Sequence, residues 1–204
     1  MARSFLSPVT FEKRVRAREG FLNVDLYGLV RHAPEGPETM VREVLERGAS
    51  VAILPYDPVR DTVLTVEEFR IGPLAAGCSE SDWALPGPVA GVVDPGESPV
   101  EAALREAQEE AGVRIDEEAL FDPMTILPSP GGSSEVVTLL LAETDLSDVR
   151  EGRFGASGET EETSVRIMTR VEALRLIMSR PVSGHLTALM LRLETMRLSG
   201  AFTR

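Results

Sequence analysis

From residue 49 onward, short apolar runs alternate with polar turns in a pattern that predicts both strands and helices. The strand-like runs are SVAILPY, TVLTVEEFR, VAGVV, VVTLLLAE and TSVRIMTR. Two later stretches, VEALRLIMSR and HLTALMLRLETMRL, space their apolar residues as amphipathic helices do. Strands interspersed with helices favour the α/β class, in which helices cover a sheet.

Residues 1–47 carry a different pattern and predict a small β-rich unit. FLNVDLYGLV alternates as a strand does, MVREVLERG suits either a second strand or a short helix, and APEGPE between them indicates a turn. A unit of this size cannot bury a core by itself. We therefore expect two domains, residues 1–47 and 48–204, with the first packed on the second or on a partner subunit.

Two polar stretches predict loops. The first runs from Gly72 to Pro88, and Trp83 within it is interpreted as a loop anchor rather than a ring platform near a site. The second, residues 145–162, is acidic and predicts a mobile loop. His32 and His185 stand in no motif, and we expect both to be structural.

A short helix with clear boundaries is predicted just after residue 98. Ser98 is a good N-cap, Pro99 a good first residue, and Glu101 completes an S-x-x-E capping box. Gly112 is a typical C-terminal stop. The buried stripe is expected to consist of Val100, Ala103, Leu104, Ala107 and Ala111.

Acidic residues crowd this helix and the loop before it: Glu97, Glu101, Glu106, Glu109 and Glu110. Glu106 and Glu110 stack on one face, where like charges destabilise a helix by about a few tenths of a kcal/mol. Carboxylate oxygens are hard ligands that suit Mg²⁺ or Mn²⁺. The alternative is a solvated acidic face, but such faces usually interleave lysine, and this helix has none. The pattern therefore indicates metal-assisted chemistry on a phosphate group.

The composition of the chain limits the classes of molecule that it is expected to bind. With 21 Lys and Arg against 33 Asp and Glu, the net charge is −12, which argues against broad binding to nucleic acid or to an anionic membrane. No apolar run is long enough to span a bilayer, and the N-terminus lacks the apolar core of a signal peptide. Cys78 is the only cysteine, so no internal disulfide forms. These features favour a cytoplasmic protein with a small anionic substrate.

The acidic stretch matches the pattern G-x5-E-x7-R-E-U-x-E-E-x-G-U, where U is aliphatic, and so resembles the signature of the Nudix hydrolases. The matching residues are Gly91, Glu97, Arg105, Glu106, Ala107, Glu109, Glu110, Gly112 and Val113. This resemblance implies an α/β/α sandwich with a mixed sheet. It also implies hydrolysis of a nucleoside diphosphate linked to another group.

Other segments are similar to the ADP-ribose pyrophosphatase subgroup of that family. They are GFLNVDLY, VREVLERG, LPYDPVRD, EEFRIGP and SPGGSSE. The resemblance implies hydrolysis of ADP-ribose to AMP and ribose 5-phosphate. Two alternatives stay open: a pyrophosphatase for other nucleoside diphosphate sugars, and a non-catalytic ADP-ribose sensor. RNA decapping is disfavoured because the chain is acidic and shows no basic stripe.

The resemblance also implies roles for residues of the acidic stretch. Mg²⁺, with Mn²⁺ as an alternative, would be held by Glu106, Glu110 and the backbone carbonyl of Ala90, and Glu109 and Glu97 would share in binding it or orient its ligands. Arg105 would hold the carboxylates in place, and with Glu109 it completes the catalytic set on the helix.

Substrate contacts are implied outside the acidic stretch. Arg70 would bind the diphosphate, Phe21 would stack on adenine, Arg42 would contact the nucleotide, and Ser129 and Glu135 would hold the terminal ribose. The plain alternatives are a strand-end arginine for Arg70, strand packing for Phe21, and a turn capped by Ser129 and Glu135. In the family the N-terminal unit is exchanged between subunits, which implies a domain-swapped homodimer with composite sites.

The general base would be a glutamate on a flexible loop. The segment GETEE offers Glu159 first, Glu161 next, and Glu162. One departure concerns the strand before Ala90, where relatives commonly carry an acidic residue and this chain has Pro86 and Pro88. The path of the backbone into Ala90 is therefore expected to differ.

Overall fold

The computed structural model describes residues 6–154 and 163–202 and divides the chain into two compact units. The smaller unit consists of Met1–Gly48 and Leu127–Val136, and the larger of Ala49–Ile126 and Val137–Arg204. The segment Leu127–Val136, which lies inside the expected second domain, thus packs with the N-terminal strands.

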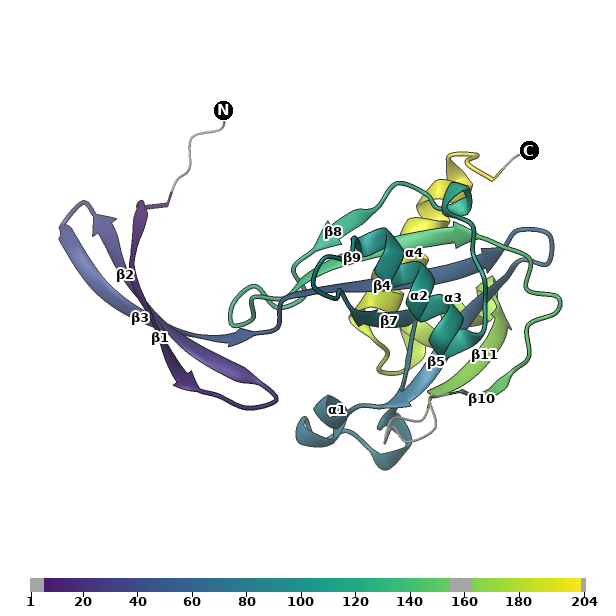
Figure 1. Ribbon diagram of the computed structural model, residues 1–204, viewed down its shortest axis with the longest axis horizontal. Helices are drawn as coiled ribbons and strands as arrows, with labels where there is room; N and C mark the ends of the chain where they lie inside the picture. Colours follow the sequence, from purple (N-terminus) through teal and green to yellow (C-terminus); the bar gives the residue numbers. More distant parts are fainter. Residues whose placement is uncertain (1–5, 155–162, 203–204) are drawn as a thin grey trace. The chain divides into compact units, whose positions relative to one another are not determined.

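The larger unit is built on an eight-stranded mixed sheet with the order β10-β11-β5-β4-β9-β8, on which β6 pairs with β5 and β7 with β4 (Figure 1). Its strands are β4 (Ala49–Asp57), β5 (Thr62–Phe69), β6 (Ala84–Gly87), β7 (Val89–Val92), β8 (Met124–Ile126), β9 (Val136–Glu143), β10 (Gly152–Phe154) and β11 (Thr163–Thr169). All five strand-like runs of the sequence lie in this sheet. Strands β6, β8 and β10 are short and were not expected.

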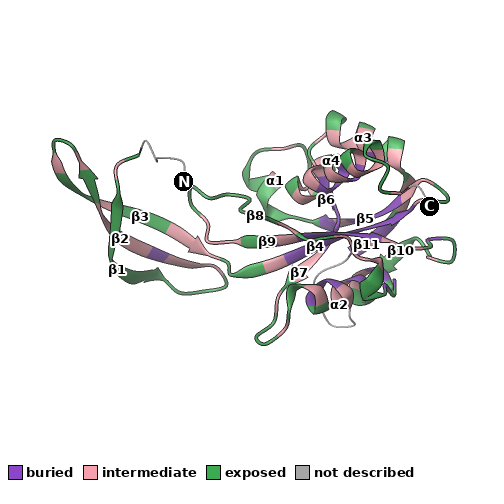
Figure 2. Ribbon diagram, turned by 90° about the horizontal axis from the view of Figure 1, so that it is seen from above, coloured by how far each residue is buried: buried purple, intermediate pink, exposed green. Residues whose placement is uncertain are grey.

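Helices cover both faces of this sheet, as Figure 2 shows: α2 (Pro99–Ala111) lies on one face, and α3 (Arg170–Ser179) and α4 (Gly184–Leu198) lie on the other. Each face has its own apolar core. Val51, Ile53, Leu64 and Val66 of the sheet pack with the alanines of α2, whereas Ala52, Leu54, Tyr56 and Val63 pack with α4. This arrangement confirms the expected α/β/α sandwich. Within the described ranges, no helix combines the length and apolar character needed to cross a membrane.

The polar stretch expected to be a loop contains three short elements: α1 (Ile71–Ala75), a 3₁₀ turn at Glu80–Asp82, and β6. Strand β6 pairs with β5, and β7 pairs with β4. Pro88 stands between them, where its missing N–H removes a ladder donor and lets the chain change partner. The unusual path into Ala90 is therefore a switch from one strand to the next.

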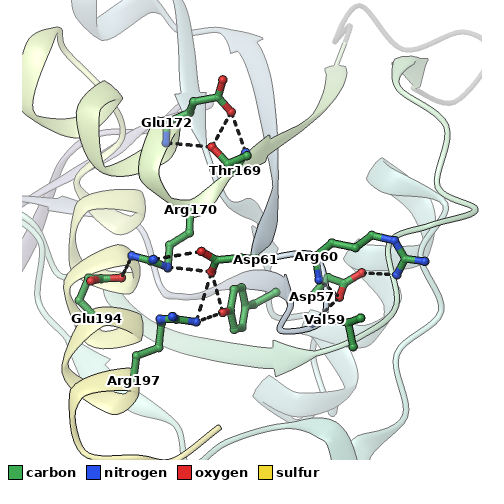
Figure 3. Close-up of polar contacts among 10 residues, drawn as sticks. Asp57, Val59, Arg60, Asp61, Thr169, Arg170, Glu172, Glu194 and Arg197 are labelled. Carbon is green, nitrogen blue, oxygen red and sulfur yellow. Dashed lines mark hydrogen bonds and ion pairs between the residues drawn. The ribbon is translucent and has the colours of Figure 1, made fainter. Parts of the chain in front are cut away.

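A polar network joins the β4–β5 turn to the helices on the α4 side (Figure 3). Asp61, at a positive φ of 53°, accepts hydrogen bonds from Arg170 Nε at 2.8 Å and Nη2 at 3.0 Å, and from the Tyr56 hydroxyl at 2.9 Å. Arg197 lies 3.2 Å from the same carboxylate, and Arg170 also donates to Glu194 at 2.7 Å. One carboxylate therefore ties the turn to both α3 and α4.

The smaller unit is a three-stranded antiparallel sheet of β1 (Val9–Arg18), β2 (Asn23–Ala33) and β3 (Gly36–Glu46). The stretch that suited either a strand or a short helix is thus part of strand β3. Strand β1 was not expected. All ten of its residues are exposed. Apolar and polar side chains alternate along it except at Lys13, so the sequence did carry a strand signal here that was missed.

The smaller sheet buries an ionic cluster in place of a large apolar core. Asp25 on β2 is 1% exposed and accepts hydrogen bonds from Arg14 and Arg16 of β1. The Tyr27 hydroxyl donates to Glu46 at 2.7 Å, and Arg14 lies 3.3 Å from the same carboxylate. These charges link all three strands through side chains.

Candidate active site

Local sequence fixes the limits of α2, the helix that carries most of the acidic residues. The Ser98 hydroxyl accepts from the Glu101 amide at 3.2 Å, and the Glu101 carboxylate accepts from the Ser98 amide at 2.8 Å. Gly112 ends the helix in the left-handed conformation at φ 64°. The expected capping box and stop are thus confirmed. They set the rotation at which the acidic side chains leave the helix.

Arg105 gathers three of the acids around one guanidinium group. It donates to Glu97 at 3.0 Å, to Glu106 at 2.8 Å and to Glu109 at 3.0 Å. It also donates to the carbonyl of Val92 at 3.2 Å, which anchors it to β7. The hydrogen bond to Glu97 is the main cause of its raised pKa, and the same contact lowers the pKa of Glu97.

Glu106 and Glu110 point back at strand β7, which lies under the helix. The side chain of Glu106 occupies the space above Gly91, where a Cβ would lie only 1.9 Å from its Oε1. Glu110 accepts a hydrogen bond of 3.3 Å from the amide of Ala90. Two neighbouring residues of β7 therefore face the two carboxylates. Gly91 leaves room for Glu106 because it has no Cβ, and Ala90 donates its backbone amide to Glu110.

Burial makes these two carboxylates costly to ionise. Burial raises the pKa of Glu106 and raises that of Glu110 to about 7, which the amide of Ala90 partly opposes. The negative charges of Glu106 and Glu68 raise the pKa of Glu110 further, whereas Arg70 lowers it. Glu110 thus lies within electrostatic reach of the last residues of β5.

Glu68 is a site residue that the sequence analysis does not single out. Its side chain is 8% exposed and pairs with Arg70, whose guanidinium Nη2 lies 2.5 Å from Glu68 Oε2. Arg70 follows β5 directly, is half-exposed, and donates its amide to the carbonyl of Trp83 at 2.9 Å. The signal for Glu68 was present: it stands two residues after Val66 and four after Leu64, in a row that otherwise faces the core.

The charges of this site fit a divalent cation. Five carboxylates, those of Glu68, Glu97, Glu106, Glu109 and Glu110, lie around two guanidinium groups, which leaves an excess of three negative charges. Hard oxygen ligands around such an excess suit Mg²⁺ or a similar ion. In the part of the chain that the structure describes, no three acidic, His or Cys side chains converge closely enough to hold a metal. Side-chain rotation, above all away from Arg105, would have to accompany binding.

Phe21 and Arg42 belong to the smaller unit. Phe21 stands in the turn between β1 and β2, outside both strands, and is 96% exposed in the single chain. Arg42 lies on β3 opposite Tyr27, and its guanidinium donates to the carbonyl of Val41 at 3.0 Å. Both side chains are accessible to a ligand.

Ser129 and Glu135 also belong to the smaller unit. The Ser129 carbonyl accepts from the Ser133 amide at 2.9 Å, and the Glu135 amide donates to the Ser133 hydroxyl at 3.2 Å, so backbone and Ser133 contacts shape the turn. Ser134 anchors this turn to β3 by donating its amide to the Leu45 carbonyl at 2.9 Å.

The candidate bases, the loop tryptophan and one histidine complete the set of predicted residues. Glu159 and Glu161, the candidate bases, lie outside the described residues, as does Glu162. Trp83 donates from Nε1 to the carbonyl of Cys78 at 3.3 Å, which confirms it as a loop anchor. His32 contacts Thr10 at 2.9 Å across the β1–β2 pair, in keeping with a structural role.

Known proteins resemble this chain along most of its length. It is 36% identical over 179 residues to an ADP-ribose pyrophosphatase of Escherichia coli strain K12, an alignment that covers 83% of each chain. It is 33% identical over 152 residues to a GDP-mannose pyrophosphatase of Cronobacter sakazakii, which covers 74% of this chain and 75% of that protein. Among solved structures, one described as an ADP compounds hydrolase aligns with a TM-score of 0.71 over 98% of this chain and 99% of its own, at 22% identity.

The family assignment rests on these similarities and on the acidic helix together. A model described as the NUDIX domain matches residues 46–190, which include β4 to β11 and the helices α1, α2 and α3. That range contains the capped helix, Arg105 and every carboxylate grouped around it. The chain therefore belongs to the Nudix family of hydrolases.

Proposed function

We propose that this protein hydrolyses the diphosphate of ADP-ribose to AMP and ribose 5-phosphate in a reaction that depends on Mg²⁺. The observation that carries the proposal is the capped helix α2, which directs Glu106 and Glu110 at strand β7 in a site with excess negative charge. The relatives named ADP-ribose pyrophosphatase, at 36% identity over 83% of the chain, support the choice of substrate.

The cation would be held by Glu106, Glu110 and the Ala90 carbonyl, with Glu109 and Glu97 as further ligands or as groups that orient them. When bound, such a cation neutralises charge on the diphosphate and polarises phosphorus. Arg105 keeps Glu97, Glu106 and Glu109 together before binding. Manganese would serve the same ligands, since they offer only oxygen.

The substrate contacts are proposed on accessibility and chemistry. Arg70 would receive the diphosphate, Phe21 would stack on adenine, and Arg42 would contact the nucleotide. Ser129 and Glu135 would hold the terminal ribose, whose paired hydroxyls suit a carboxylate acceptor. Glu159, with Glu161 as the alternative, would take the proton of the attacking water.

Two properties of the whole protein belong to the same proposal. The three-stranded sheet of the smaller unit exposes apolar side chains, among them Phe11, Val15 and Val41, and this supports a homodimer that exchanges its N-terminal units. A single cysteine and an acidic composition support a cytoplasmic location, without nucleic acid or membrane as partner.

The direct test incubates purified protein with ADP-ribose and Mg²⁺ and separates the nucleotides by chromatography. AMP should form in the presence of Mg²⁺ and not in the presence of EDTA. Glu110→Gln should reduce the rate by about two orders of magnitude or more, because it removes a charge from the metal site. Absence of AMP at micromolar enzyme contradicts the proposal, and calorimetric binding of ADP-ribose without turnover would favour a sensor.

A second candidate is a pyrophosphatase for other nucleoside diphosphate sugars. The similarity to GDP-mannose pyrophosphatases, at 33% identity over 74% of the chain, favours this alternative specifically. A panel of ADP-ribose, GDP-mannose and ADP-glucose decides between them by kcat/KM. ADP-ribose should give the highest value of the three.

A further inference from the structure

Glu68 is a buried carboxylate in a row of side chains that is otherwise apolar. On β5, Leu64 and Val66 face helix α2 and belong to its core, and Glu68 continues the same row by the two-residue alternation of a strand. An isolated buried carboxylate is strongly unfavourable and persists only when it is paired. An apolar residue would suit this position, so the buried carboxylate of Glu68 requires an explanation.

One partner of Glu68 is Arg70, which directly follows β5. Arg70 Nη2 lies 2.5 Å from Glu68 Oε2, and the arginine side chain is 49% exposed while the carboxylate is 8% exposed. Both charges act on Glu110, Glu68 raising its pKa and Arg70 lowering it. The pair thus lies within electrostatic reach of Glu110, and the arginine is its more exposed member.

The preceding residue shows what an ordinary surface pair on this strand looks like. Glu67 faces the opposite side of the sheet by alternation and pairs with Arg166 at 3.1 Å, and its carboxylate is 19% exposed. That pair joins two neighbouring strands. Glu68 forms an ion pair with Arg70, which lies two residues further along and just past the end of the same strand.

Restraining Arg70 before ligand binding would have an energetic effect. A free arginine side chain has rotamer entropy that is lost when the group is fixed on a ligand. A carboxylate that already holds the guanidinium reduces this loss, as preorganisation generally does. A planar guanidinium group that binds a carboxylate through one nitrogen can still receive an anion in a forked contact on another edge.

We propose that Glu68 is a positioning residue that holds the Arg70 guanidinium at the end of β5, ready to receive the diphosphate of the substrate. The inference rests on the proposed function, because Arg70 is its link to the substrate. It assigns Glu68 no contact with the reacting atoms and no place among the ligands of the cation.

A double-mutant cycle tests the dependence of Glu68 on Arg70. Glu68→Gln keeps the shape of the side chain and should raise KM for ADP-ribose about tenfold with kcat changed less than about threefold. Arg70→Gln should lower kcat/KM about a hundredfold, and the double variant should be no worse than Arg70→Gln alone, since coupled residues are not additive. Multiplicative losses would overturn the inference.

Glu67→Gln is the matched control, since it removes the neighbouring carboxylate on the other face and should leave kcat/KM within about twofold of the unmodified protein. Thermal unfolding of every variant checks that the fold is intact. Glu68→Asp keeps the charge, so its KM should lie between those of the unmodified protein and Glu68→Gln.

A second readout does not depend on turnover. Titration with Mn²⁺ alone, followed by electron paramagnetic resonance, should give Glu68→Gln the same affinity as the unmodified protein within about twofold. A loss of tenfold or more, as expected for a ligand or its direct support, would make Glu68 part of the metal site and overturn the positioning role.

Failure of the proposed function is distinguishable from failure of this inference. If the unmodified protein does not hydrolyse ADP-ribose, the proposed function fails, and the cycle is run on the nucleoside diphosphate sugar that the substrate panel identifies. If ADP-ribose is hydrolysed but Glu68→Gln matches Glu67→Gln, the inference alone fails.

Discussion

At Gly91, an added Cβ would clash with the side chain of Glu106. A Cβ there would lie 1.9 Å from Glu106 Oε1, 2.1 Å from its Cδ and 2.6 Å from its Cγ, so the glutamate side chain would have to leave its place. Because a side chain can swing away, Gly91→Ala should fold but lose about a hundredfold or more in kcat/KM through a misplaced metal ligand. Steady-state hydrolysis of ADP-ribose measures the loss.

Gly184 supplies the matched control for that substitution. It is the first residue of α4, and a Cβ there would meet nothing within 4 Å. Gly184→Ala should therefore leave kcat/KM unchanged and raise stability slightly, by about 0.5 kcal/mol. Full activity of Gly91→Ala would show that Glu106 does not need its present place.

Glu110 should make the metal-free protein less stable as the pH rises. Its pKa is about 7 in the folded protein and near 4.5 in the unfolded chain, so between these values the folded state binds the proton and the unfolded state does not. The free energy of unfolding therefore falls through this range. Glu110→Gln should raise the free energy of unfolding by about 1 to 3 kcal/mol at pH 8 and by almost nothing at pH 4.

Urea unfolding in EDTA at both pH values measures this difference. Mg²⁺ should stabilise the unmodified protein at pH 8 more than it stabilises Glu110→Gln, since only the native carboxylate offers a full charge. A difference between the two proteins that does not depend on pH would contradict the role of burial at Glu110.

At the scale of elements, two helices offer a matched pair of capping boxes. Ser98 caps α2 and Thr169 caps α3, each in a reciprocal contact with a glutamate three residues later. Ser98→Ala and Thr169→Ala should each lower the free energy of unfolding by about 1 kcal/mol. Only Ser98→Ala should also weaken Mn²⁺ binding, because α2, and not α3, carries Glu106, Glu109 and Glu110. Equal loss of Mn²⁺ affinity in both variants would contradict this.

The sequence was informative where local chemistry sets an element's limits. Ser98, Glu101 and Gly112 define α2 by contacts within a few residues, and the capping box was predicted in full. Strand β1 has an alternating pattern but no local marker of its ends, and Lys13 breaks the pattern where the pairing with β2 also shifts register. The switch at Pro88 depends on which strands are neighbours, and that follows from the fold of the whole sheet.

The site shows the same division. The acids of α2 and Arg105 follow from one continuous motif, whereas Glu68 comes from a strand and joins them only through pairing with Arg70 and packing of the sheet against the helix. The grouping of Leu127–Val136 with the N-terminal strands also depends on long-range contacts, such as the hydrogen bond of 2.8 Å from the Leu45 amide to the Gly132 carbonyl.

At the scale of the whole molecule, the smaller unit lacks the apolar core that usually stabilises a sheet. Three-stranded sheets need one packed face for stability in water. In this unit Phe11 is 60% exposed, Val15 50% and Val41 55%, and Asp25 occupies one of the two buried positions of the central strand. These features favour burial of the sheet against a second copy of the chain.

Sedimentation equilibrium should accordingly give a mass of about twice the 22.1 kDa of one chain. Phe11 and Val41 lie on opposite faces of the sheet by their register with β2, so Phe11→Asp and Val41→Asp test the faces separately. At least one should raise the dimer dissociation constant about a hundredfold, because a buried charge without a partner destabilises an interface by several kcal/mol. Val59→Asp changes an 87% exposed turn position of the larger unit and should leave the dimer dissociation constant unchanged. A monomeric mass for the unmodified protein at micromolar concentration would rule out the dimer, and with it a site shared between subunits.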